Sequence, residues 1–104
     1  MLAIPNLYLP TITLGELYLG ALRSAKPAQN TTQVNMFADL CIVLACDEAT
    51  AQSYATVKLA LQQQGTPIPE NDIWIAAIAV QHGLTLSTRD SHFSSVAGLS
   101  LDLW

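Results

Sequence analysis

Positive charge is scarce in this chain of 104 residues. It carries four cations and eight acidic residues, for a formal net charge of −4. Four cations cannot form a broad phosphate-binding face, so a basic nucleic-acid-binding domain is excluded. Charged residues make up only 12% of the chain while hydrophobic residues make up 51%, a balance that excludes intrinsic disorder. We expect a partner to cover part of the apolar surface.

Cysteines and long hydrophobic runs are also few. Cys41 and Cys46 lie in or beside an apolar run, so we expect buried, reduced core residues rather than a disulfide or metal pair. The longest uninterrupted apolar run, residues 73–80, is far shorter than the ~20 residues that cross a bilayer. Residues 1–10 have no cationic segment and no Ala-x-Ala site, so no signal peptide is expected. The chain is therefore expected to be a single cytoplasmic domain over residues 1–104.

Short β-prone segments alternate with helical patterns along the chain. Strands are predicted at residues 7–12, 42–46, 84–88 and 99–103, with helices between them. Strands that alternate with helices usually pair in parallel. The sequence therefore predicts an α/β architecture.

Several residues are predicted to begin or end these helices. The start signals are a Thr13–Glu16 capping box, an N-cap at Asp47 and a cap at Asn71 or Glu70; the end signals are Gly65 and Gly83. Residues 29–32 are predicted to form a loop before a short helix. The helix over residues 72–82 is apolar on all sides, which predicts that it is buried.

Three acidic residues are predicted near the carboxyl ends of strands, where α/β sheets bind ligands. Glu16 lies one turn into the first helix, Asp72 in the first turn of the apolar helix, and Asp90 two residues past strand 84–88. Carboxylates that share a cleft repel one another, so they raise their pKa values or hold a cation. Oxygen ligands favour Mg²⁺ or Mn²⁺, and such an ion can polarise a phosphodiester and activate water.

Each of these acids also has a purely structural interpretation. Glu16 could complete the capping box, Asp72 could complement the helix dipole, and Asp90 could form an Asx turn. His82 and His92 have no Cys or His partner at ligand spacing, so surface or supporting roles are expected for them. Spacing alone therefore leaves the metal site a hypothesis.

Three segments, taken together, resemble the PIN-domain family, and most closely its VapC-type toxic ribonucleases of toxin–antitoxin pairs. The segments are TLGELYLGA at residues 13–21, NDIWIAA at 71–77 and TRDSHF at 88–93. The resemblance extends over nearly the whole chain, and the motifs keep the family's order. It implies a three-layer α/β/α sandwich with a mainly parallel sheet.

The resemblance also implies a divalent-metal-dependent endoribonuclease that uses Mg²⁺ or Mn²⁺. Glu16, Asp72 and Asp90 match the acidic metal ligands of the family. Three further residues beside the acids match positions that could orient ligands or the phosphate: Asn71, Thr88 and Arg89. Arg89 could equally make a surface ion pair. The implied partners are a VapB-type antitoxin whose C-terminal segment covers the active-site groove, an RNA substrate (often tRNA), and a second copy in a homodimer.

The chain departs from the family's pattern before Leu7. Family members open with a strand that ends in Asp and lies at the centre of the sheet, whereas no acidic residue precedes Glu16 here. Without that strand, strands 7–12 and 42–46 would be separated from strands 84–88 and 99–103, and we expect weak or no activity. Three explanations of the missing strand and its Asp remain open. The chain is an N-terminally shortened form or has a mis-assigned start, another chain completes the sheet, or the chain is a degenerate homologue without nuclease activity. The alternative function is a non-catalytic PIN-like module that dimerises and binds an antitoxin.

Overall fold

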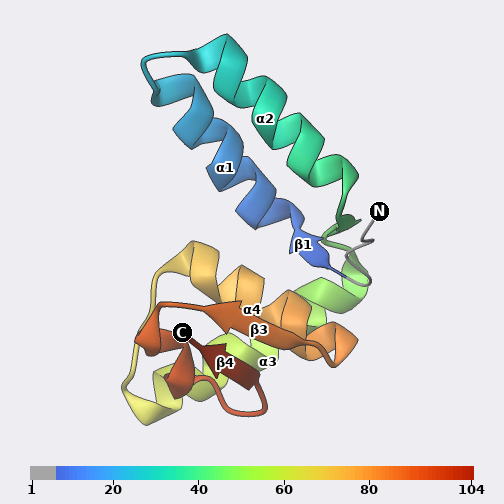
Figure 1. Ribbon diagram of the computed structural model, residues 1–104. Helices are drawn as coiled ribbons and strands as arrows, with labels where there is room; N and C mark the ends of the chain where they lie inside the picture. The colour runs from blue at the N-terminus through green and yellow to red at the C-terminus, as the bar shows by residue number, and fades with distance from the viewer. Residues whose placement is uncertain (1–6) are drawn as a thin grey trace. The chain divides into compact units, whose positions relative to one another are not determined.

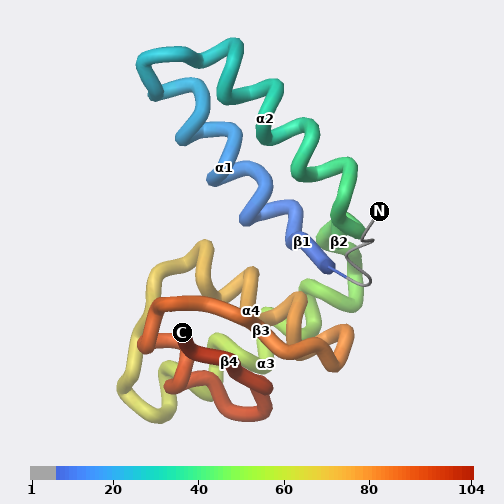
Figure 2. The backbone as a smooth tube through the Cα atoms, viewed as in Figure 1, coloured from blue at the N-terminus to red at the C-terminus, as the bar shows by residue number. Residues whose placement is uncertain are grey.

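The structure is a computed structural model that describes residues 7–104. Residues 1–6, part of the segment in which no signal peptide is expected, lie outside the described residues. The chain divides into two compact units, an N-terminal unit that ends at Ala45 and a C-terminal unit over Cys46–Trp104. Each unit has one pair of parallel strands together with helices (Figures 1 and 2). This alternation of helices and parallel strands confirms the predicted α/β class.

The N-terminal unit is a helical hairpin flanked by two short strands. Its elements are β1 (Tyr8–Pro10), α1 (Thr11–Arg23), α2 (Pro27–Asp39) and β2 (Ile42–Leu44). The strands pair in parallel, with Tyr8 opposite Ile42, and the two helices run side by side in Figure 2. The Tyr18 hydroxyl donates to Asn35 Oδ1 at 2.5 Å, which ties α1 to α2.

Two predicted helix starts in this unit are wrong. The Thr13–Glu16 capping box is not formed, because α1 begins earlier, at Thr11, and has no side-chain cap. The loop predicted at residues 29–32 is helical, because Pro27 occupies the first turn of α2. Proline favours this position since its fixed φ suits a helix and its missing N–H leaves no donor unpaired.

The strand β2 is more exposed than its apolar sequence indicated. Ile42 is 48% exposed and Val43 is 43% exposed, although a buried strand was predicted. Cys41 is only half-buried and Cys46 is exposed, so the prediction of two buried cysteines is also wrong; both are free thiols. Within the described residues β2 pairs with β1 alone, and a two-stranded sheet offers only a narrow face for other elements to cover.

The C-terminal unit packs two helices and a strand pair around one apolar core. Its elements are α3 (Glu48–Gln64), α4 (Glu70–His82), β3 (Thr85–Thr88), the short 3-10 helix η1 (Ser91–Ser95) and β4 (Ser100–Leu103). β3 pairs in parallel with β4, and α3 packs along α4. Gly65 and Gly83 end the two helices with φ of 71° and 63°, a left-handed conformation that glycine adopts readily.

Helix α4 is the buried element of the C-terminal unit. Ile73 and residues 75–79 are all buried, and Ala76, Ala77 and Ile78 have no exposed surface. This confirms the burial predicted from its apolar sequence. No helix within residues 7–104 is both long enough and apolar enough to span a membrane.

The strands form two separate pairs among the described residues. One sheet contains β1 and β2, and the other contains β3 and β4. This is the separation that the sequence predicted for a chain without the family's central strand. The prediction of a single domain over residues 1–104 stays a prediction.

The start of α4 is held by a cluster of side chains instead of the predicted cap. Its N-cap residue is Pro69, and neither Asn71 nor Glu70 caps it. Glu70 accepts hydrogen bonds from the Tyr54 hydroxyl and from Lys58 on α3, and these bonds hold the pKa of Glu70 below its ordinary value. The ring of Tyr54 also stacks on Trp74, with centroids 3.9 Å apart.

Asp47 caps α3, as predicted, and also joins it to α4. Its Oδ1 accepts the Thr50 backbone N–H at 2.9 Å, while the Thr50 hydroxyl accepts the Asp47 N–H at 3.0 Å. Gln81, near the end of α4, donates to the same Oδ1 at 3.0 Å. The bond from the Thr50 backbone is the largest cause that lowers the pKa of Asp47 from its ordinary value of 3.8, and the Thr50 side chain and Gln81 add to it.

This cap predicts an acid-dependent loss of stability. Because the pKa of Asp47 is lower in the folded than in the unfolded chain, ionised Asp47 stabilises the fold above about pH 4, and the stabilisation disappears as the pH falls through the folded pKa. Asn also caps helices but has no charge to lose. The free energy of unfolding of Asp47→Asn, measured by urea denaturation, should therefore fall less than that of the wild type between pH 5 and pH 3. Asp39→Asn, at the end of α2, is the control, and equal slopes for Asp47→Asn and the wild type would contradict this role.

Candidate functional site

Asp72 lies in the first turn of α4, at one end of the buried helix. Its backbone N–H donates to the Pro69 carbonyl at 3.0 Å, and Ile73, the next residue, is buried in the core. Its side chain is 18% exposed. The apolar helix thus holds a carboxylate at the surface of the C-terminal unit in one orientation.

Asp90 lies two residues past the end of β3, where the chain turns into η1. Its backbone N–H donates to Thr88 Oγ1 at 3.1 Å, and its Oδ1 accepts the backbone N–H of His92 at 3.2 Å. The second bond is the Asx-type contact that a structural role predicts. The same geometry fixes the position of the carboxylate, so the structural interpretation and a ligand role are compatible.

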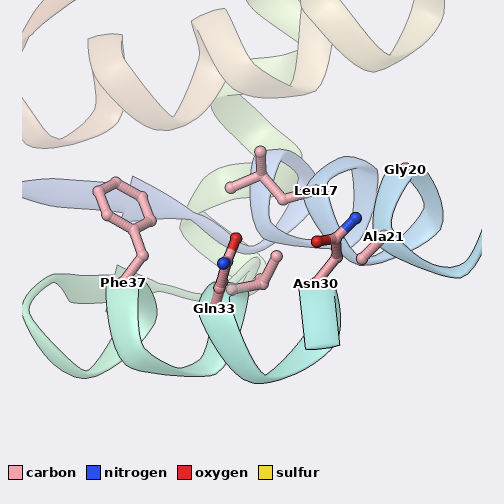
Figure 3. Close-up of a pocket in the computed structure, with 7 residues that line it drawn as sticks. Leu17, Gly20, Ala21, Asn30, Gln33 and Phe37 are labelled. Carbon is pink, nitrogen blue, oxygen red and sulfur yellow. The ribbon is translucent and has the colours of Figure 1, made fainter. Parts of the chain in front are cut away.

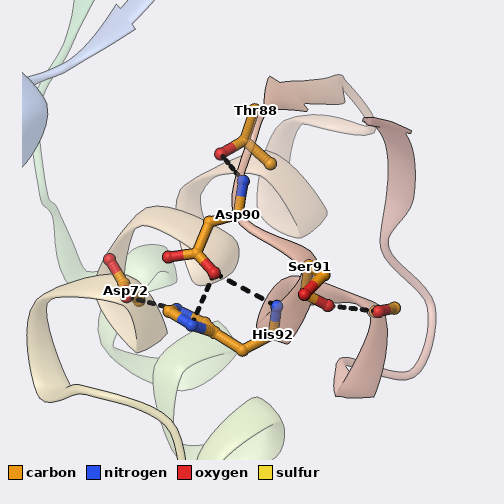
Figure 4. Close-up of polar contacts among 6 residues, drawn as sticks. Asp72, Thr88, Asp90, Ser91 and His92 are labelled. Carbon is orange, nitrogen blue, oxygen red and sulfur yellow. Dashed lines mark hydrogen bonds and ion pairs between the residues drawn. The ribbon is translucent and has the colours of Figure 1, made fainter. Parts of the chain in front are cut away.

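His92 brings these two carboxylates together (Figure 4). Its Nε2 lies 2.6 Å from Asp72 Oδ2, and its Nδ1 lies 2.7 Å from Asp90 Oδ1. Phe93, the next residue of η1, is buried and its ring lies 5.2 Å from the imidazole. The 3-10 helix is therefore anchored by the buried Phe93 side chain and by the contacts of His92 with the two carboxylates.

Asp72, Asp90 and His92 form a cluster that could hold a metal ion. One ligand atom from each residue lies within 4.8 Å of the others. Donors that share a divalent cation at about 2.0–2.6 Å lie roughly 3–5 Å apart, so the residues present fit such an ion. Two carboxylates this close also favour a positive charge between them.

The other predicted site residues have different surroundings. Thr88 orients the Asp90 backbone, and Asn71 is exposed beside Asp72. The guanidinium of Arg89 lies over the Trp104 ring, 4.2 Å from its centroid, and no ion pair of Arg89 occurs among residues 7–104. Glu16 is exposed on α1 of the N-terminal unit, so the structure brings Asp72 and Asp90 together within one unit and describes Glu16 in the other.

His92 is the residue that the sequence did not single out. With no Cys or His at ligand spacing, its sequence context predicts only a surface or supporting role. The structure places its ring, 34% exposed, between two acids. The available signal was the two-residue spacing of His92 from Asp90 in a turn after a strand, which allows a side chain to fold back onto the acid.

The N-terminal unit carries an open groove between α1 and α2 (Figure 3). In Figure 3, the side chains of Asn30, Gln33 and Phe37 on α2 face Leu17 and Ala21 on α1. Leu17 and Phe37 are exposed although both are apolar. This groove is part of a wider set of exposed apolar side chains on the unit: Leu19, Leu22, Met36 and Leu40.

Comparison with known proteins identifies the family. The family model described as PIN domain matches residues 1–99. The chain is 33% identical to Ribonuclease VapC4 from Mycobacterium tuberculosis, covering 82% of this chain and 67% of that protein. It is also 33% identical to the tRNA(fMet)-specific endonuclease VapC from Shigella flexneri, covering 90% of this chain and 72% of that protein.

A solved complex gives the same result at the level of the fold. The DNA-bound VapBC structure from Salmonella typhimurium is similar with a TM-score of 0.89 and 31% identity, over 93% of this chain and 74% of that one. The chain therefore belongs to the PIN domain family, and its similarity is to the VapC ribonucleases within it.

Proposed function

We propose that this chain is a VapC-type toxin, a divalent-metal-dependent endoribonuclease that hydrolyses RNA phosphodiesters. The observation that carries the proposal is the convergence of Asp72, Asp90 and His92 just past the carboxyl end of β3. In α/β folds this is the edge at which ligands bind. Two relatives that align with more than four-fifths of this chain are named Ribonuclease VapC4 and tRNA(fMet)-specific endonuclease VapC, which supports the same activity.

Asp72 and Asp90 would hold the metal, Mg²⁺ or Mn²⁺. When bound, the ion polarises the scissile phosphodiester and lowers the pKa of water at the site. Glu16 on α1 is proposed as a further carboxylate ligand, as the family resemblance implies. The chain's contribution is a fixed pair of carboxylates: α4 orients Asp72 through its buried neighbours, and Thr88 orients Asp90 through a backbone hydrogen bond.

Two exposed side chains next to the acids are proposed to contact the RNA. Arg89 presents a guanidinium that the Trp104 ring supports from one face, and guanidinium groups bind phosphate oxygens with two parallel hydrogen bonds. Asn71 offers an amide beside Asp72. A tRNA is the proposed substrate class, because the relative from Shigella flexneri is named for a tRNA.

Removing either clustered carboxylate should abolish cleavage. Asp72→Asn and Asp90→Asn each remove one negative charge from the metal site and keep the side-chain shape. Because the wild-type rate of this chain is expected to be weak, the variants are compared in the protein completed by the family's N-terminal strand. We expect each to reduce its cleavage of tRNA in Mg²⁺ or Mn²⁺ on the order of 100-fold or more, measured as the rate of product formation on denaturing gels. Asp102→Asn, an exposed acid on β4, should retain the wild-type rate.

EDTA is the second arm of this experiment. Cleavage that persists in EDTA, or in both variants, would contradict the metal assignment. Binding of an antitoxin without RNA cleavage under any metal condition would instead support the non-catalytic module.

Glu16 provides an independent test of the ligand set. Because it lies on a different unit from the Asp72–Asp90 pair, Glu16→Gln should leave the fold of the C-terminal unit unchanged while weakening metal-dependent cleavage by roughly tenfold or more. The measurement is the cleavage rate as a function of Mn²⁺ concentration. Glu48→Gln, at the first turn of α3, is the matched control, and equal metal dependence of Glu16→Gln and the wild type would exclude Glu16 from the site.

The proposed partner is a VapB-type antitoxin. The solved relatives with TM-scores of 0.89 are VapBC complexes. The N-terminal unit exposes an apolar groove of the kind that protein partners cover. The resemblance implies that the C-terminal segment of the antitoxin covers the active site, and we propose that the antitoxin also contacts this groove, through Phe37 and Leu17.

A charge placed in the groove should weaken this complex. Phe37→Asp puts a carboxylate among apolar side chains, and we expect roughly tenfold or more loss of affinity for the cognate VapB-type antitoxin in calorimetric titration. Leu59→Asp, an equally drastic change at an exposed position of α3, is the control. If Phe37→Asp binds the antitoxin normally but converts a dimer into a monomer in light scattering, the groove is the homodimer interface and the antitoxin assignment is wrong.

A further inference from the structure

Both ring nitrogens of His92 are engaged by carboxylates of the proposed metal centre. Nδ1 lies 2.7 Å from Asp90 Oδ1 and Nε2 lies 2.6 Å from Asp72 Oδ2, and Figure 4 shows the ring between the two acids. The backbone N–H of His92 donates to Asp90 Oδ1 and the next residue, Phe93, is buried, so the main chain that carries the ring is fixed next to Asp90. The two nitrogen contacts then set the orientation of the ring.

A neutral imidazole ring cannot donate a hydrogen bond to both Asp90 and Asp72. A neutral imidazole carries one N–H and one lone pair. The contact of Nε2 with Asp72 Oδ2 at 2.6 Å is a hydrogen bond when Nε2 carries a hydrogen. When Nδ1–H donates to Asp90 instead, a neutral Nε2 has no hydrogen for Asp72, and a cation bound by both Nε2 and the carboxylate takes the place of that hydrogen.

This arrangement matches a recurrent design of metal sites. A ligating histidine usually donates its other ring N–H to a carboxylate, which fixes the tautomer and raises the basicity of the ligating nitrogen. Asp90 Oδ1 is in position to do this for His92. Both contacts from His92 reach the same oxygen of Asp90, Oδ1, so Oδ2 of Asp90 can face the metal.

We propose that His92 is itself a ligand, through Nε2, of the metal that Asp72 and Asp90 hold, and that it shifts the site from Mg²⁺ towards a first-row transition ion such as Mn²⁺. The inference rests on the proposed function, since it concerns the same metal centre. Mg²⁺ prefers oxygen donors and keeps most of its waters, whereas imidazole nitrogen suits first-row transition ions better. One nitrogen in the donor set therefore changes the preference of an otherwise acidic site.

The direct test detects nitrogen bound to the ion. Mn²⁺ is added to the full-length chain, and pulsed electron paramagnetic resonance records its coupling to ¹⁴N. We expect an imidazole nitrogen coupling in the wild type that changes to the ¹⁵N pattern when the protein is grown with ¹⁵N-labelled histidine. The chain has only two histidines, so His92→Gln should lose the coupling and His82→Gln, on the last turn of α4, should keep it.

Metal affinity gives the second readout. In calorimetric titration, His92→Gln should bind Mn²⁺ about tenfold more weakly than the wild type, while its affinity for Mg²⁺ changes by less than about threefold. His82→Gln should match the wild type for both ions. Equal losses for Mn²⁺ and Mg²⁺ would mean that His92 only positions the carboxylates, and would overturn the proposal.

The failure of this inference can be told apart from failure of the proposed function. In one outcome the wild type binds Mn²⁺ and Asp72→Asn weakens this binding, but no histidine nitrogen couples to the ion. His92 is then not a ligand, while the acidic metal centre of the proposed function stands. If the wild type binds neither ion, the metal centre of the proposed function fails and this inference fails with it. The wild-type labelling arm needs no substitution, so a poorly folded His92→Gln does not block the decision.

Discussion

The burial of α4 is the constraint on which the C-terminal unit depends. Ala76, Ala77 and Ile78 have no exposed surface, and removal of such side chains from water is the main favourable term in folding. A helix this apolar cannot lie on the surface, so α3 and the strand β3 pack against it. The position of the residues at the two ends of α4, including Asp72 in its first turn, follows from that burial.

Polar contacts then complete what apolar packing begins. At the start of α4, Tyr54 and Lys58 bind Glu70, and near its end Gln81 binds Asp47. These bonds connect α3 to both ends of α4, so the helix can neither slide nor rotate without breaking them. A rigid helix is what a metal site requires, because ligand atoms must be held in place before the ion arrives.

The helices of the C-terminal unit were predictable because their signals are local. Asp47 caps and Gly65 ends α3, and the apolar run of α4 is buried, all as the sequence indicated. One error lies where a contact from a distant residue accompanies a different helix start from the one that the local signal predicts. Thr13 and Glu16 match a capping box, yet α1 begins earlier, at Thr11, whose hydroxyl binds Leu44 across the strand pair.

The acids and their order along the chain are properties of the sequence, because strand ends and helix starts are set by residues a few positions away. Asp72 and Asp90 could therefore be named in advance, and so could the family. Only the tertiary structure decided that the His92 ring lies between them, since Asp72 is 20 residues distant along the chain and no local pattern connects the two. The same holds for Arg89, whose partner Trp104 meets it only because β4 pairs with β3. The sequence determines which side chains are present and in what order, whereas the convergence of distant side chains depends on packing.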